Sequence, residues 1–306
     1  MSVRAWKRII TLFVVVLIFS LLATSIVFAV NYNRVSKEYD QISSDKNLID
    51  LSDYSELDSD ELKHFVTYLN NVDINKTLDY QQKYSHLFID NDFVFEEATE
   101  QKVCYLTFDD GPDPTVTTRV LDVLKEYNVK ATFFVVYKDG KEERELYNRI
   151  VDEGHTVGVH TSSHNYTKIY SSVDNYLKDF NRCANQIERV TGVKPEIFRF
   201  PGGSINSYNL SLYHELIAEM IRRGYTYYDW NSASGDASKP YVSPKTIRDN
   251  VLNSSSNVKK KIILMHDGKG HSTTAEALPE IIEGLAKQGY EFRALDNSVS
   301  PICFGY

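Results

Sequence analysis

From about residue 101 onward, short apolar runs alternate with amphipathic stretches. The apolar runs predict strands at residues 102–108, 131–136, 156–160, 197–201, 225–230, 261–266 and 291–295. The stretches between them predict helices at residues 116–127, 142–153, 173–191, 210–224, 244–254 and 274–289. Strands that alternate with helices predict a parallel α/β sheet covered by helices. An open doubly wound sheet and a barrel both fit this pattern, and about seven β/α units favour a distorted (β/α)7-8 barrel.

The N-terminal segment departs from this pattern, because residues 9–30 are apolar and carry no charge. Such a run is long enough to cross a bilayer as a helix. Basic residues without any acidic residue precede it: Arg4, Lys7 and Arg8. The positive-inside rule predicts a cytoplasmic segment at 1–8, a transmembrane anchor at 9–30 and an extracellular remainder. The alternative is a signal peptide cleaved near Val27-Phe28-Ala29, which would also export the remainder.

Residues 31–98 are predicted to form an extracellular stalk, and residues 99–306 a globular domain. Residues 31–100 hold 16 acidic and six basic residues, so the acidity of the chain, with its net charge of −8, is concentrated there. Residues 59–69 begin with a serine and acidic residues and continue with apolar residues at helical spacing, so we expect a partly helical stalk. A small partner-binding module is the alternative. The acidic balance counts against nucleic-acid binding through a basic surface.

The chain has three cysteines, Cys104, Cys183 and Cys303, too few for a disulfide framework. Cys104 lies in an apolar run and is predicted to be a small core residue. The sequence leaves a single Cys104–Cys303 bridge open.

The first candidate site follows the first predicted strand, where Asp109 and Asp110 stand side by side before Gly111-Pro112. Adjacent side chains of an extended strand point to opposite faces. A turn at Gly111-Pro112 would let both carboxylates face one cavity, where one could bind a metal while the other acts as a base. The alternative is a plain acidic turn, because Asp, Gly and Pro are common turn residues.

The second candidate site is the pair His160 and His164, four residues apart and again just past a predicted strand. On one helical turn, histidines at this spacing would lie on the same side and could chelate one ion. A lone histidine there would more often be structural. Two imidazoles and one carboxylate with an open position form a recognised catalytic zinc set, so the two clusters together predict a metal site.

Three further strand ends carry polar residues. Arg199 precedes Pro201-Gly202-Gly203, so an arginine able to pair with a carboxylate stands near backbone N–H groups that a ligand can approach closely. Residues 228–237 contain Tyr228, Asp229, Trp230 and Asp236. His266 ends a buried strand and suits a general acid tuned by a nearby carboxylate. The alternatives are a surface arginine before a turn and a hydrogen-bonded histidine at a strand end.

These motifs together resemble the NodB-type polysaccharide deacetylase family, carbohydrate esterase family 4, and in particular its peptidoglycan N-acetylglucosamine deacetylases. The resemblance covers about residues 101–296, and TFDDGP, HTSSH, RFPGG, GDA and LMHD occur in the family order. It implies catalytic roles for four residues: Asp109 as base, Arg199 as its orienting partner, His266 as acid and Asp236 as the carboxylate that tunes the acid. It implies three ligands for Zn²⁺, or for another divalent transition metal such as Co²⁺: Asp110, His160 and His164.

The same resemblance implies that the backbone of Gly202 donates to the oxyanion and that Leu264 and Trp230 line the acetyl and sugar sites. Many family members carry an aromatic residue at Gly202 and a Trp at Ala237, so we expect a roomier or differently lined groove here. The implied activity is metal-dependent removal of N-acetyl groups from a cell-surface polysaccharide. A tethered, outward-facing enzyme meets peptidoglycan first. Chitooligosaccharide, poly-N-acetylglucosamine and acetylxylan are alternative substrates, and a non-catalytic glycan-binding module is the alternative from another class.

Overall fold

The computed structural model describes residues 78–97, 100–254 and 258–304. All of them belong to one compact unit, Asn75–Tyr306. The predicted anchor at residues 9–30 and the predicted helix at residues 59–69 lie outside the described residues. Among the helices in the described ranges, none has the length and apolar character needed to cross a bilayer.

The described residues form one eight-stranded sheet in which β8 pairs with β1 and the other strands follow the order β5-β4-β3-β2-β1-β7-β6. The strands are β1 (Val103–Asp109), β2 (Thr132–Val136), β3 (Thr156–Thr161), β4 (Ile197–Phe198), β5 (Thr226–Tyr227), β6 (Ser232–Ala233), β7 (Lys260–His266) and β8 (Glu291–Phe292). All pairs are parallel. The parallel architecture predicted from the sequence is therefore confirmed.

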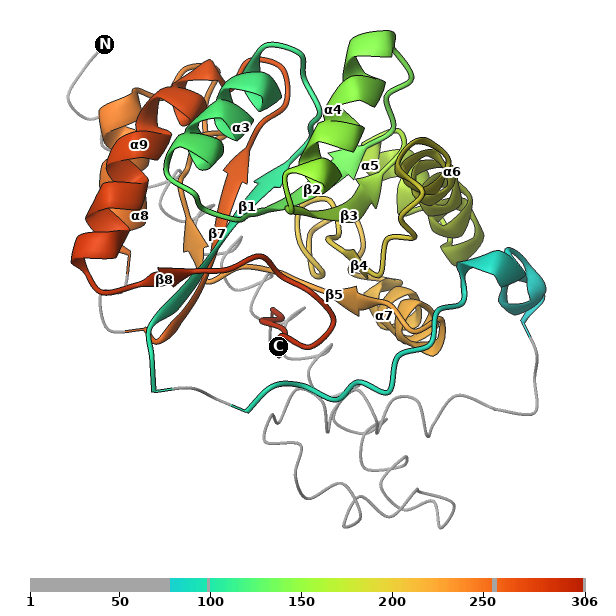
Figure 1. The fold of residues 1–306 in the computed structure, drawn as a ribbon. Helices are drawn as coiled ribbons and strands as arrows, with labels where there is room; N and C mark the ends of the chain where they lie inside the picture. The colour runs from blue at the N-terminus through green and yellow to red at the C-terminus, as the bar shows by residue number, and fades with distance from the viewer. Residues whose placement is uncertain (1–77, 98–99, 255–257, 305–306) are drawn as a thin grey trace, which may run out of the picture. The chain divides into compact units, whose positions relative to one another are not determined.

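The sheet curls into a half-barrel whose ladder stays open between β5 and β6, which do not pair within the described part of the chain (Figure 1). Both of these edge strands have only two residues. Next to β5, the Asp229 N–H donates to the Ile302 carbonyl at 2.8 Å, so the C-terminal tail satisfies a donor at this edge. The tail thus takes up part of the hydrogen bonding that a closed barrel would use there.

The helices are α3 (Val116–Glu126), α4 (Lys141–Asp152), α5 (Tyr166–Ile169), α6 (Val173–Thr191), α7 (Tyr213–Arg222), α8 (Pro244–Asn253) and α9 (Ser272–Lys287). Six of them match the predicted helices, with ends shifted by up to a few residues. The bounds of α6 agree fully, because Ser172 caps its first turn and Gly192 ends it at φ 73°. The sequence pattern missed the short elements α5 and β6.

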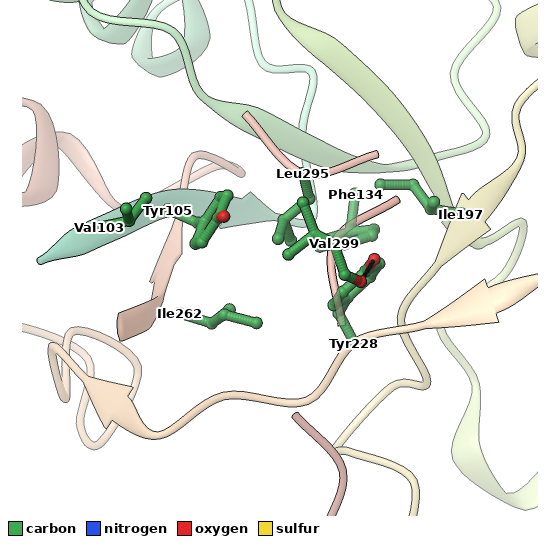
Figure 2. Close-up of a cluster of buried hydrophobic side chains, with 8 residues drawn as sticks. All are labelled: Val103, Tyr105, Phe134, Ile197, Tyr228, Ile262, Leu295 and Val299. Carbon is green, nitrogen blue, oxygen red and sulfur yellow. Dashed lines mark hydrogen bonds between the residues drawn. The ribbon is translucent and has the colours of Figure 1, made fainter. Parts of the chain in front are cut away.

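The sheet separates two hydrophobic layers. Neighbouring helices contact one another in the order α8, α9, α3, α4, α6 and α7 and cover the outer face (Figure 1). On the inner face lies a buried cluster from β1, β2, β4, β7, the residue after β5 and the C-terminal segment: Val103, Tyr105, Phe134, Ile197, Tyr228, Ile262, Leu295 and Val299 (Figure 2). The period of two along β1 therefore sends Val103, Tyr105, Thr107 and Asp109 inward.

Residues before β1 also belong to this unit. The segment contains η2 (Asp79–Gln82) and η3 (Ser85–Leu87), two short 3-10 helices. The buried Arg223 guanidinium donates to three carbonyl groups of this segment, those of Tyr80, Lys83 and Tyr84. The predicted division between a stalk at 31–98 and a domain at 99–306 stays a prediction.

The cysteines form no disulfide with one another. Cys104 is fully buried in β1, as expected for a small core residue, and the Cys183 thiol donates to the Val135 carbonyl at 3.2 Å. A bridge between Cys104 and Cys303, which the sequence left open, is not formed.

Candidate active site

Asp109 ends β1 on the inner face and is held by a buried arginine. Arg199 follows β4, and its Nη1 donates to Asp109 Oδ1 at 2.9 Å and to Thr107 Oγ1 at 2.6 Å. The rest of the guanidinium donates to the carbonyl groups of Tyr228 and Asp229 at 2.7 and 3.1 Å. Burial raises the pKa of Asp109, and the charge of Arg199 opposes that rise. One oxygen of the Asp109 carboxylate is thus fixed, while Oδ2 faces His160.

Asp110 turns its carboxylate toward the same cavity because its backbone is left-handed, with φ 73°. Apart from glycine, only Asn and Asp adopt this conformation with any frequency. Its Oδ1 lies 3.6 Å from His160 Nε2 and 3.1 Å from His164 Nε2. The turn expected at Gly111-Pro112 thus begins one residue earlier, and both carboxylates lie close to the His160 ring, with Asp109 Oδ2 3.9 Å and Asp110 Oδ1 3.6 Å from its Nε2.

The two histidines come from a strand and a turn, so the helical turn suggested by their spacing is not what joins them. His160 lies in β3 and is buried, whereas His164 lies in the following turn at φ 49° and is partly exposed. Asp179 of α6 fixes this turn by accepting from the backbone N–H groups of Ser162 and Ser163, at 2.6 and 3.1 Å. The spacing predicted the convergence of the two rings but not its structural cause.

Asp110, His160 and His164 form a donor set that suits a transition metal. Their ligand atoms lie within 4.8 Å of one another. Asp110 Oδ1 is buried without a hydrogen-bond partner in the described part of the chain. His160 Nδ1 lies 2.8 Å from the Arg199 carbonyl, which must accept, so Nε2 keeps its lone pair for the cavity. Burial lowers the pKa of His160 to about 3, which keeps this imidazole neutral, as metal ligation requires.

Across the cavity, His266 is paired with Asp236. His266 ends β7, and its Cα is the ladder partner of that of Asp109. Asp236 Oδ1 lies 2.8 Å from His266 Nδ1, and Asp236 Oδ2 accepts from the His266 backbone N–H and from Thr274 Oγ1, both at 2.8 Å. Burial works against protonation, but the hydrogen bond and charge of Asp236, helped by Asp109 and Asp110, raise the pKa of His266 to about 9. His266 is therefore an imidazolium at neutral pH.

The loop at Gly202 leaves a backbone donor available. Gly202 has φ 77°, and its N–H has no hydrogen-bond partner among the described residues. The carbonyl of Pro201 accepts from Tyr170 Oη at 2.7 Å, which fixes the loop. A Cβ built on Gly202 would lie 2.8 Å from the Tyr166 ring. The Tyr166 ring therefore occupies the space that a side chain at position 202 would need, so the expectation of a roomier site is not supported there.

Tyr166 belongs to an aromatic group at the edge of the cavity. Its ring meets that of His164 edge-on with centroids 5.3 Å apart, and it contacts the ring of Tyr208 at 5.1 Å. Tyr208 is 56% exposed. Sequence patterns singled out neither tyrosine, because one lies in a four-residue helix and the other in a loop.

The two predicted apolar walls lie in different surroundings. Leu264 stands two residues before His266 on β7, so both side chains project from the same face of the sheet. Trp230 packs against the buried inner cluster and meets the ring of Phe304 at 4.8 Å. The Arg199 guanidinium lies 5.6 Å from the Trp230 ring, so Trp230 also borders the group that holds Asp109.

Asp229 is a buried organising residue whose role the sequence did not reveal. Its Oδ1 accepts from the Ser204 N–H at 2.8 Å, and its Oδ2 accepts from the Phe304 N–H at 2.7 Å. It therefore connects the loop at Gly202 to the C-terminal tail. Its position among the polar residues of 228–237 was the available signal in the sequence, but its partners Ser204 and Phe304 are 25 and 75 residues away.

Comparison with known proteins gives concordant matches. The family profile described as polysaccharide deacetylase matches residues 96–221. A peptidoglycan-N-acetylglucosamine deacetylase of Bacillus cereus is 35% identical over 67% of this chain and 74% of its own length. The peptidoglycan-N-acetylmuramic acid deacetylase PdaA of Bacillus subtilis is 30% identical over 71% of this chain and 76% of its own. The crystal structure of the catalytic domain of a peptidoglycan N-acetylglucosamine deacetylase from Eubacterium rectale aligns with a TM-score of 0.64 and 35% identity, covering 70% of this chain and 96% of that one.

Proposed function

The chain belongs to the NodB-type polysaccharide deacetylase family of hydrolases, and from this membership we propose that it removes N-acetyl groups from peptidoglycan N-acetylglucosamine and releases acetate. The observation that carries the proposal is the convergence of three groups at the carboxyl ends of the parallel strands. These are the Asp109–Arg199 pair, the Asp110, His160 and His164 donor set, and the His266–Asp236 pair.

In this proposal Asp109 is the general base. Arg199 holds Oδ1, so the second carboxylate oxygen is directed toward the cavity, where it can accept a proton from the attacking water. Arg199 is fully buried, and its guanidinium also donates to Thr107 and to the loop beyond β5. Because these bonds fix the guanidinium, the Asp109 carboxylate bound to it is kept in one orientation.

Asp110, His160 and His164 would hold a divalent transition metal, for which we propose zinc. When bound, such an ion supplies a Lewis acid that polarises the acetyl carbonyl and increases the acidity of water. The protein contributes the neutral state of His160, the fixed tautomer set by the Arg199 carbonyl, and the turn that carries His164. The Gly202 N–H is then available to donate to the oxyanion that develops on the carbonyl oxygen.

His266 is the general acid. Water adds its oxygen to the acyl carbon, the carbon–nitrogen bond breaks, and the sugar nitrogen takes a proton from His266 as it leaves. An amine anion is too basic to leave without that proton. Asp236 keeps the ring oriented through Nδ1 and keeps it protonated at neutral pH. The products are acetate and a glucosamine unit, which becomes an ammonium in water.

The choice of substrate rests on relatives and on the cavity edge. The matched B. cereus enzyme acts by name on N-acetylglucosamine and the B. subtilis enzyme on N-acetylmuramic acid, both within peptidoglycan. At the cavity edge, Tyr166 and Tyr208 offer adjacent aromatic faces on which a sugar ring can stack. We favour N-acetylglucosamine, and N-acetylmuramic acid is the first alternative. The catalytic domain would face outward, held by the predicted anchor at residues 9–30.

The test is acetate release by the purified full-length chain loaded with zinc, on N-acetylated peptidoglycan and on N-acetylglucosamine oligomers. We expect release that a chelator abolishes and zinc restores. Asp109→Asn should lower kcat by at least about 100-fold, because a positioned base contributes that much or more. Asp92→Asn, an exposed carboxylate outside the cavity, is the matched control and should be fully active. Equal activity of Asp109→Asn and the parent chain would refute the assignment of the base.

A further inference from the structure

A second histidine cluster lies beside the proposed acid. His271 immediately precedes α9, and its ring lies against that of His266 with centroids 5.1 Å apart and planes 26° apart. The side chains of Asp236, His266 and His271 each offer a ligand atom, and these atoms lie within 4.8 Å of one another. Two imidazoles and a carboxylate are the same chemical set that forms the first site.

The proposed reaction does not use His271. Its ring is only partly buried, and neither ring nitrogen has a hydrogen-bond partner within residues 78–97, 100–254 and 258–304. A neutral imidazole beside a carboxylate and a second imidazole is a ready ligand for a borderline-soft cation.

We propose that Asp236, His266 and His271 form a second, weaker site for zinc, and that its occupation at excess zinc inhibits the enzyme. This inference rests on the proposed role of His266 as general acid. An ion bound there would take a lone pair of His266 or an oxygen of Asp236, and the acid could then no longer be protonated and oriented for the leaving amine.

The hydrogen bonds explain why the second site is the weaker one. Asp110 Oδ1 in the first site has no partner among the described residues, so a metal can bind it without breaking a hydrogen bond. Asp236 already accepts from the His266 ring, the His266 backbone and Thr274. Zinc at the second site must break at least one of these hydrogen bonds and release a proton from His266. Both requirements lower the affinity of the second site for zinc.

The test is zinc binding by equilibrium dialysis of the full-length chain, together with activity as zinc is raised beyond saturation of the first site. We expect a second zinc ion, bound at least tenfold more weakly than the first, and a fall in activity over the same concentration range. His271→Asn should bind only the first ion and escape inhibition while keeping its basal activity. Asn is a favourable N-cap residue, so this change preserves the start of α9. His271→Gln also lacks the imidazole and should give the same result as His271→Asn.

His86→Asn removes an exposed histidine outside both clusters and should still bind both ions. His164→Ala should lose the tighter ion and keep the weaker one. A parent chain that binds one zinc ion only, or a His271→Asn chain that still binds two, would overturn the proposal. A parent chain that binds two ions but releases no acetate from any glycan would instead count against the proposed function and leave the second site standing.

Discussion

At the scale of single residues, the protonation of His266 depends on one carboxylate. Asp236 contacts both the ring and the backbone of His266, and the pKa of the imidazole rises to about 9. The acid works only while it carries its proton, so activity should fall as the pH rises through about 9. In Asp236→Asn the charge is lost, burial then lowers the pKa of His266, and the alkaline limb of kcat should move to lower pH. A pH profile of kcat for both chains decides this, and an unchanged alkaline limb would show that another group sets it.

Tyr208 offers a prediction about binding. Its exposed ring lies beside Tyr166 at the cavity edge, so Tyr208→Ala should remove a stacking surface of about 1 kcal/mol. We expect KM for N-acetylglucosamine oligomers to rise roughly 5-fold with little change in kcat. Tyr127→Ala is the matched control. Tyr127 lies at the C-terminal end of α3, which leads into the start of β2, so it stands at the end of the sheet opposite the proposed site. A change in kcat without a change in KM would mean that Tyr208 acts on catalysis and not on glycan binding.

At the scale of elements, the sequence predicted the parts with strong periodicity and missed those without it. The strands β1 and β7 and the helix α6 are long enough for a clear pattern. The two-residue β6 and the four-residue α5 are not. The motifs predicted Asp109, Asp110 and the histidines as site residues, because acidic and imidazole groups at strand ends are unusual, and the structure brings Asp110, His160 and His164 close together. The groups that hold them, such as Asp179 and Asp229, are distant in the chain and show no local pattern.

The helix α6 supports the proposed metal site through Asp179, which accepts from two backbone N–H groups of the turn that carries His164. Asp179→Ala would leave both donors without that partner, and we expect zinc affinity to fall roughly 10- to 100-fold, as for other groups that orient ligands. Zinc titration of the full-length chain measures this. The control is Asp174→Ala on the same helix, because its exposed ion pair with Lys83 should contribute little. Equal losses in the two variants would point to a general effect on α6.

At the scale of the whole described unit, the C-terminal tail connects distant parts of the site. Leu295 and Val299 of the tail lie in the inner cluster (Figure 2). Further along the tail, the Phe304 N–H donates to Asp229, and the Phe304 ring packs on Trp230. A Cβ built on Gly203 would lie 2.3 Å from the Phe304 ring, so the tail also contacts the loop beside Gly202. The tail thus bears on both the core and the proposed oxyanion donor.

Truncation before Ile302 should therefore reduce both stability and activity. It removes the partner of the Asp229 N–H and one donor to the buried Asp229 carboxylate, at a cost of about 1–3 kcal/mol for groups left unsatisfied. We expect a lower midpoint of thermal unfolding and a lower kcat. Phe304→Ala keeps both backbone bonds and should lose less stability than the truncation. A truncated chain as stable and active as the parent would show that the tail is dispensable.

Asp109 and His266 are ladder partners on neighbouring strands, so the sheet itself sets the spacing between proposed base and acid. Inserting or deleting one residue in either strand would turn one of them to the opposite face. During divergence from a common ancestor, β1 and β7 can therefore accept almost no change in length, whereas α5 with Tyr166 and the loop with Tyr208 lie outside this ladder and are not bound by its register. New glycan preferences are therefore open to such a lineage without any loss of its inherited chemistry.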